Sequence, residues 1–112
     1  MVSPGFVNAR GLADSPLDAA SQFHARIVPP LREAMKRNAV LVVCFDPADH
    51  SHRAWRLAAI QDLAREAAPS CRINAVVGEL NGASADVLAF LGRSPGVTGQ
   101  ILEVDAISGE KA

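Results

Sequence analysis

Four side chains that could do chemistry gather in one short stretch of the chain. Asp46, Asp49, His50 and His52 are residue types that bind zinc or transfer protons. Zinc sites use three or four ligands at supported spacing, and residues two apart on a helix do not face each other. We therefore predict no metal site and interpret the histidines as surface residues that cap a helix. A new active site built from these four residues is the alternative.

The two cysteines show no pattern of metal or redox chemistry. Cys44 and Cys71 each lie in or beside an apolar run and form no CxxC pair. Buried, reduced thiols of this kind are typical of proteins in reducing compartments. We therefore expect a cytoplasmic location.

Length and composition narrow the class of protein further. A chain of 112 residues with 49% hydrophobic residues suffices for one packed domain, which we place over residues 1–112 with a loose tail at 106–112. Eleven basic and twelve acidic residues give a net charge of −1, which argues against nucleic-acid binding. No apolar stretch approaches the roughly 20 residues of a membrane span, and residues 1–8 do not resemble a secretion signal.

Turn residues and hydrophobic periodicity divide the chain into alternating strands and helices. Four apolar or β-branched runs predict strands, at 6–7, 39–45, 72–77 and 100–104. Helices are predicted from Ser15 to Asn38, from 51 to 68 and from 84 to 91, with a kink or break at Pro29-Pro30. This alternation predicts an α/β domain with a four-stranded parallel sheet and three helices, similar to half of a Rossmann sheet.

Several segments resemble the C-terminal half of the short-chain dehydrogenase/reductase family. The clearest is VTGQILEVD at 97–105, which is similar to the family's closing strand. DVLAFL at 86–91 is similar to the helix before that strand, and LAREAAP at 63–69 followed by RINAV at 72–76 resembles another family segment. NARG at 8–11 is a weak echo of the family's NNAG loop. These segments follow one another in the family's order over almost the whole chain.

The resemblance implies chemistry for which this chain lacks the residues. The family's reaction uses a Tyr, a Lys four residues later and a Ser at the end of the preceding strand. Counting back from Pro69 puts Asp49 at the Tyr position and Arg53 at the Lys position, and the chain contains no Tyr. The strand that should end in Ser ends in Cys44-Phe45-Asp46. We therefore predict no catalytic residue.

The family's cofactor site is expected to be missing as well. Members of the family bind a dinucleotide at a Gly-rich turn after their first strand. This chain begins near what would be the fourth strand and contains no such turn, so we expect no cofactor. Asn8, Gly11 and Asn74 are at most weak vestiges of family cofactor contacts.

These observations favour a non-catalytic, reductase-like subunit. We expect it to form a homo-oligomer (dimer or tetramer) or to associate with an active full-length reductase of the family, in a structural or regulatory role. The apolar faces of the two long helices supply the predicted interface: Phe23, Ile27, Trp55, Ala58, Ala59, Ile60, Leu63 and Ala67. Two alternatives remain, an NAD(P)-linked or other small-ligand enzyme with the altered site described above, and a module that binds a small acidic or nucleotide ligand at helix N-termini.

Overall fold

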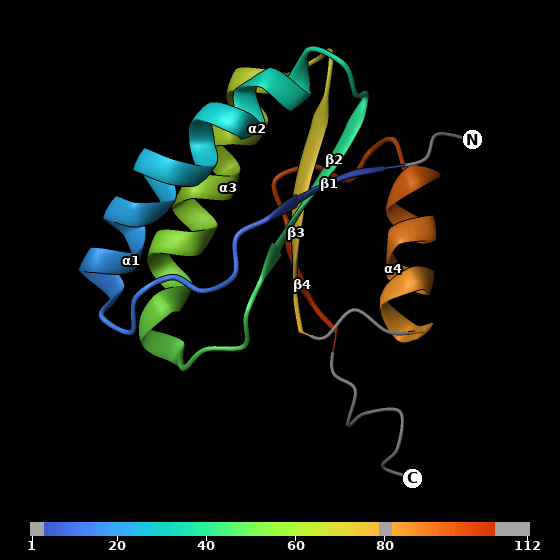
Figure 1. Ribbon diagram of the computed structural model, residues 1–112. Coiled ribbons are helices and arrows are strands. Elements are labelled where there is room, and N and C mark those ends of the chain that lie inside the picture. Colours follow the sequence, from blue (N-terminus) through green and yellow to red (C-terminus); the bar gives the residue numbers. More distant parts are fainter. Residues whose placement is uncertain (1–3, 79–81, 105–112) are drawn as a thin grey trace, which may run out of the picture.

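Four parallel strands form the centre of the molecule in the computed structural model, which describes residues 4–78 and 82–104 (Figure 1). The strands lie side by side in chain order, β1-β2-β3-β4. They are β1 (Gly5–Asn8), β2 (Val40–Phe45), β3 (Arg72–Val77) and β4 (Ile101–Glu103). The helical elements are α1 (Pro16–Gln22), the π-helical η1 (Phe23–Ile27), α2 (Val28–Met35), the 3-10 turn η2 (His50–His52), α3 (Arg53–Ala67) and α4 (Gly82–Gly92). The predicted α/β fold with a parallel sheet is confirmed.

Helices cover both faces of the sheet. The continuous helical stretch α1–η1–α2 and helix α3 lie on one face, and α4 lies on the other (Figure 1). Every residue of β2 is buried, as expected for a central parallel strand covered on both sides. Because all four strands run in the same direction, their carboxyl ends meet at one edge of the sheet, which we call the carboxyl edge.

The long N-terminal helix changes its hydrogen bonding just before the two prolines. Pro29 and Pro30 lie inside α2, and the preceding turn, Phe23–Ile27, is π-helical. A proline has no N–H to donate to the carbonyl four residues earlier, and its ring crowds that carbonyl. A wider turn relieves this crowding and lets the helix continue. The predicted interruption is therefore a π turn.

The core on the α3 side contains most of the predicted interface residues. Five of the eight candidates are buried within the chain itself: Phe23, Ala59, Ile60, Leu63 and Ala67. Ile27 and Trp55 are half-buried against the same core, and Ala58 is exposed. The prediction was wrong for the five buried residues, because the helical stretch 16–35 and α3 turn their apolar faces toward each other and the sheet. Their burial is satisfied inside one chain.

Two further expectations concern the C-terminal tail and membrane-spanning segments. The proposed loose tail at 106–112 lies outside the described residues. Within the described ranges, no helix is both long enough and apolar enough to span a membrane.

Candidate functional site

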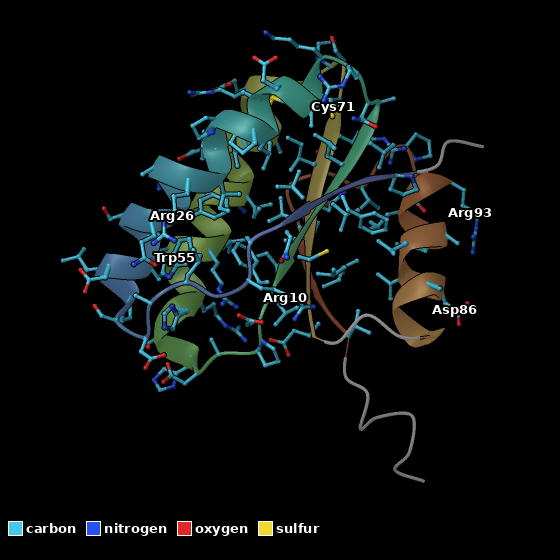
Figure 2. The ribbon with its side chains drawn as sticks, viewed as in Figure 1. Arg10, Arg26, Trp55, Cys71, Asp86 and Arg93 are labelled. Atoms are coloured by element: carbon cyan, nitrogen blue, oxygen red, sulfur yellow. The ribbon has the colours of Figure 1, made fainter. Side chains whose placement is uncertain are left out.

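An ion pair ties together the loops that follow β1 and β2 at the carboxyl edge. Arg10 Nη1 lies 3.1 Å from Asp46 Oδ1, and the Gly11 backbone N–H donates to Asp46 Oδ2 at 2.8 Å. The same guanidinium also donates to the carbonyl oxygen of Gly78, at the end of β3. Figure 2 shows Arg10 at this edge. Its side chain thus crosses from the β1 loop past the end of β2 to the end of β3.

A second arginine, Arg56, is buried next to this ion pair and contacts the backbone of Asp46. Arg56 lies on α3 with 8% of its surface exposed, and its Nη1 donates to the backbone carbonyl of Asp46 at 2.9 Å. The centre of its guanidinium is 4.4 Å from the ring centroid of Phe45 and 5.9 Å from that of Trp55. Its buried Nε has no hydrogen-bond partner within residues 4–78 and 82–104. Burial lowers the pKa of Arg56, and the charge of Asp46 opposes that shift.

The turn before α3 fixes Asp49, the residue that the resemblance is expected to place at the family's Tyr position. Asp49 caps this turn by accepting hydrogen bonds from the backbone N–H (2.9 Å) and the hydroxyl of Ser51. These hydrogen bonds lower the pKa of Asp49. A general base works best with a pKa near the working pH, so this shift moves Asp49 away from a catalytic role.

His52 is buried and has both ring nitrogens occupied. The Trp55 indole can only donate, and its Nε1 lies 3.0 Å from His52 Nδ1, which must therefore accept. The proton then resides on Nε2, which donates to the Asp14 carbonyl at 2.8 Å. This neutral tautomer leaves neither nitrogen free for a metal or a substrate. The expectation of a surface histidine was wrong for His52, because its ring lies under the loop before α1, whereas His50 is exposed.

Together these contacts weaken the altered-enzyme alternative. Of its four residues, Asp46 accepts from Arg10 and Gly11, Asp49 from Ser51, and His52 is held by Trp55 and Asp14. Only the His50 side chain makes none of the side-chain hydrogen bonds found in the described part of the chain, although its backbone carbonyl accepts from the Arg53 N–H. No three His, Cys, Asp or Glu side chains cluster around a possible metal position within residues 4–78 and 82–104.

Two pockets open at the carboxyl edge on either side of Arg56. The larger, of about 430 Å³, lies between the start of α3 and the strands β3 and β4. The smaller, of about 240 Å³, lies between the loops after β1 and β2. Arg56, His52 and Asp49 line both. Arg53, which the resemblance is expected to place at the family's Lys position, lines only the larger of these two pockets, and none of the ion pairs among the described residues includes it.

The three weak cofactor vestiges have structural roles inside the chain. Asn8 Oδ1 accepts from the Arg10 backbone N–H, and Gly11 adopts a positive φ of 77° in the loop that Asp46 closes. Asn74 is fully buried in β3, where its Nδ2 donates to the Val97 carbonyl and its Oδ1 accepts from the Gln100 N–H, both at 3.0 Å. The Asn74 side chain thus clamps the loop before β4.

Replacing Asn74 with Ala should lower the free energy of unfolding by about 2 kcal/mol, because the Val97 carbonyl and the Gln100 N–H would lose the fully buried side chain to which both are bonded. Urea denaturation checks this value. Ser94→Ala is the matched control, since it removes a hydroxyl that bonds the Phe90 carbonyl at an exposed site. A loss of stability in Asn74→Ala no larger than in the control would contradict the clamp.

The two thiols should be unreactive in the folded chain. Burial raises the pKa of Cys44 and of Cys71, against smaller opposing effects of Arg10 and Arg72. A raised pKa keeps the thiol protonated at pH values where a free cysteine, with a pKa of about 8.5, is partly thiolate. Iodoacetamide labelling at about pH 8, followed by mass spectrometry, should proceed at least about 100-fold more slowly in the native chain than in urea. Equal rates would show that the thiols are accessible.

Sequence reasoning missed Arg10 and Arg56, although the sequence held a signal for the second. Position 56 falls on the buried stripe of α3, four residues after His52 and four before Ile60. A charged residue on such a stripe is unusual and indicates a specific partner or a site. Arg10 gave no comparable signal, because its partners lie 36 and 68 residues away in the chain.

Fold and sequence comparison together define the class of this protein. The arrangement is that of a Rossmann-like α/β sheet. A family model described as SDR-like, short chain dehydrogenase-like protein, matches residues 7–104, so the chain belongs to this SDR-like family. No curated protein and no solved structure gives a significant match to the chain.

Proposed function

We propose that this chain is a non-catalytic member of its family that acts through association with another chain. The observation that carries the proposal is the pair Asp49 and Arg53, which stand where the resemblance expects the proton-transferring Tyr and its Lys. Asp49 serves as the cap of η2, and the chain has no Tyr that could act from another position. Neither side chain offers a phenolic proton to a carbonyl substrate.

The contacts of Arg10 support the same proposal. Its guanidinium and the Asp46 carboxylate join the loops after β1 and β2 and reach the Gly78 carbonyl. Ligands of open parallel sheets bind beyond the carboxyl ends of the strands. An ion pair across those ends takes up part of the space in which a nicotinamide would have to meet its substrate.

The interface needs an exposed surface, because most of the predicted interface residues on the helices are buried within the chain. Strand β1 forms one edge of the described sheet, and Phe6 on it is 54% exposed. The Ala9 N–H donates to the Cys44 carbonyl, so by alternation the backbone groups of Phe6 and Asn8 point away from β2. An edge strand with free N–H and C=O groups beside an exposed aromatic ring is a template for pairing with another strand.

Self-association through β1 is the first version to test. Analytical ultracentrifugation over a range of concentrations should show a dimer or larger species for the wild-type chain. Phe6→Lys should return it to monomer, because a charge on an edge strand opposes pairing. Leu17→Lys, which changes a residue 81% exposed on α1, is the control and should leave the assembly intact.

Other outcomes of this experiment would place the interface elsewhere on the chain without changing the proposed function. If Leu17→Lys dissociates the assembly and Phe6→Lys does not, the contact involves the outer helix face, where Ala58 is exposed. If the wild-type chain is monomeric throughout, only association with a full-length reductase remains, and co-expression with full-length members of the family tests it. A cytoplasmic location belongs to the same proposal, supported by the two free, buried cysteines.

A further inference from the structure

Arg56 is a buried cation whose charge the described chain does not balance by a direct ion pair. None of the ion pairs within residues 4–78 and 82–104 includes it. Asp46 is the acidic residue that contacts Arg56, but its carboxylate accepts hydrogen bonds from Arg10 and Gly11. Arg56 is bonded only to the backbone carbonyl of Asp46. Burying a charge is costly unless it is paired and hydrogen-bonded. The residue is more than nine-tenths buried, and its Nε has no hydrogen-bond partner among the described residues.

The unsatisfied cation lies on the wall of a pocket. Arg56 lines the larger pocket of about 430 Å³ together with Arg53, which is exposed. Three aliphatic side chains, Leu57, Val77 and Ile101, form an apolar part of the same wall. A pocket lined by both cationic and aliphatic side chains matches an amphiphilic anion.

From this arrangement we infer that the larger pocket binds a small organic monocarboxylate, with its carboxylate on Arg56 and Arg53 and its aliphatic chain against Leu57, Val77 and Ile101. A planar guanidinium suits a carboxylate because it can donate two parallel hydrogen bonds. Phe45 and Trp55 hold the guanidinium in place by stacking, so little side-chain entropy is lost on binding.

The acidic residues of the pocket restrict the charge of the ligand. Asp49 and Glu103 also line it, and their carboxylates repel a doubly charged anion more strongly than a singly charged one. Inorganic phosphate should therefore bind less well than an aliphatic monocarboxylate. The inference does not depend on the proposed association, because every residue named for the pocket belongs to a single chain.

The test is a titration of the isotopically labelled full chain with hexanoate, followed by NMR, with inorganic phosphate and hexylamine as comparison probes. Hexanoate should bind saturably and shift the amide signals of residues around Arg56 and Ile101. Phosphate and hexylamine should bind at least about tenfold more weakly, because the first carries excess charge and the second the wrong sign. Absence of saturable hexanoate binding, or equal binding of either comparison probe, would overturn the inference.

Matched variants locate the site. Arg56→Met keeps an apolar stem of similar length without the charge and should weaken hexanoate binding at least about tenfold. Arg56→Lys keeps the charge but loses the planar guanidinium that donates two parallel hydrogen bonds. It should bind hexanoate with intermediate affinity. Leu57→Trp leaves Arg56 in place but fills the apolar part of the pocket, so it should abolish hexanoate binding. This variant tests the site independently if Arg56→Met fails to fold. Hexanoate affinity unchanged in the folded Arg56→Met and Leu57→Trp variants would show that the site is elsewhere.

Discussion

Replacing Phe23 with Ala is expected to lower the free energy of unfolding by about 3–5 kcal/mol, the usual effect of removing a buried aromatic ring. Phe23 is fully buried, and its ring centroid lies 5.6 Å from that of Phe45 and 5.5 Å from that of Trp55. It lies in the π turn, where it joins the N-terminal helix to β2 and α3 at once. Removing it opens a cavity at the meeting point of three elements.

The fluorescence of Trp55, the only tryptophan of the chain, offers a direct probe for the Phe23 variant. Domains of this size are stable by about 5–15 kcal/mol, so Phe23→Ala should unfold at much lower urea concentration or be only partly folded. Leu17→Ala is the matched control, because Leu17 lies on the same helical stretch but is 81% exposed. Its midpoint should hardly change. Similar midpoints for the two variants would contradict the assignment of Phe23 to the core.

Replacing Gly78 with Ala should also cost about 3–5 kcal/mol, through backbone strain and overlap together. Gly78 has a φ of 134°, which residues with a side chain rarely adopt, and an added Cβ would lie 2.0 Å from the carbonyl oxygen of Val104. That oxygen belongs to backbone, which cannot move without pulling on the end of β4, because the Val104 N–H is bonded to the Val77 carbonyl at 2.7 Å. The change would disturb the carboxyl edge itself.

Gly96→Ala separates this effect from a general effect of adding a methyl group. An added Cβ at Gly96 meets nothing within 4 Å, and its φ lies outside the left-handed range. We expect its stability to stay within about 0.5 kcal/mol of wild type. Thermal and urea denaturation of both variants measure the difference in stability. A Gly78→Ala chain as stable as Gly96→Ala would contradict the close approach of Gly78 to the Val104 carbonyl.

The fold was largely predictable because its signals are local. The unbroken apolar run at 39–45 predicted a strand covered on both faces, and β2 is buried throughout. The strand predicted at 72–77 has the observed bounds of β3. What the sequence could not supply was the direction in which the helices turn their apolar faces. Phe23 and Ile60 could pack against a second chain or within one chain, and only the three-dimensional arrangement distinguishes these outcomes.

The candidate site was less predictable because long-range contacts build it. Asp46 and His52 were recognised as residues that could do chemistry, but their partners Arg10 and Asp14 come from a different loop. Once these partners are known, the same residues become structural. Arg56 went unnoticed among the alanines of α3, since its burial depends on how deeply the helix start lies against β2.

The proposed non-catalytic role is tested most directly by assaying NADH and NADPH oxidation by the purified full chain over a panel of ketones and aldehydes, with the reverse reaction on alcohols. If the proposed non-catalytic role is right, the rate should equal that of the buffer control, because Asp49 caps a helical turn, no Tyr replaces it, and Arg10 crosses the strand ends. Turnover above the control that is lost in an Asp49→Asn or Arg53→Gln variant would contradict the claim that this chain is non-catalytic.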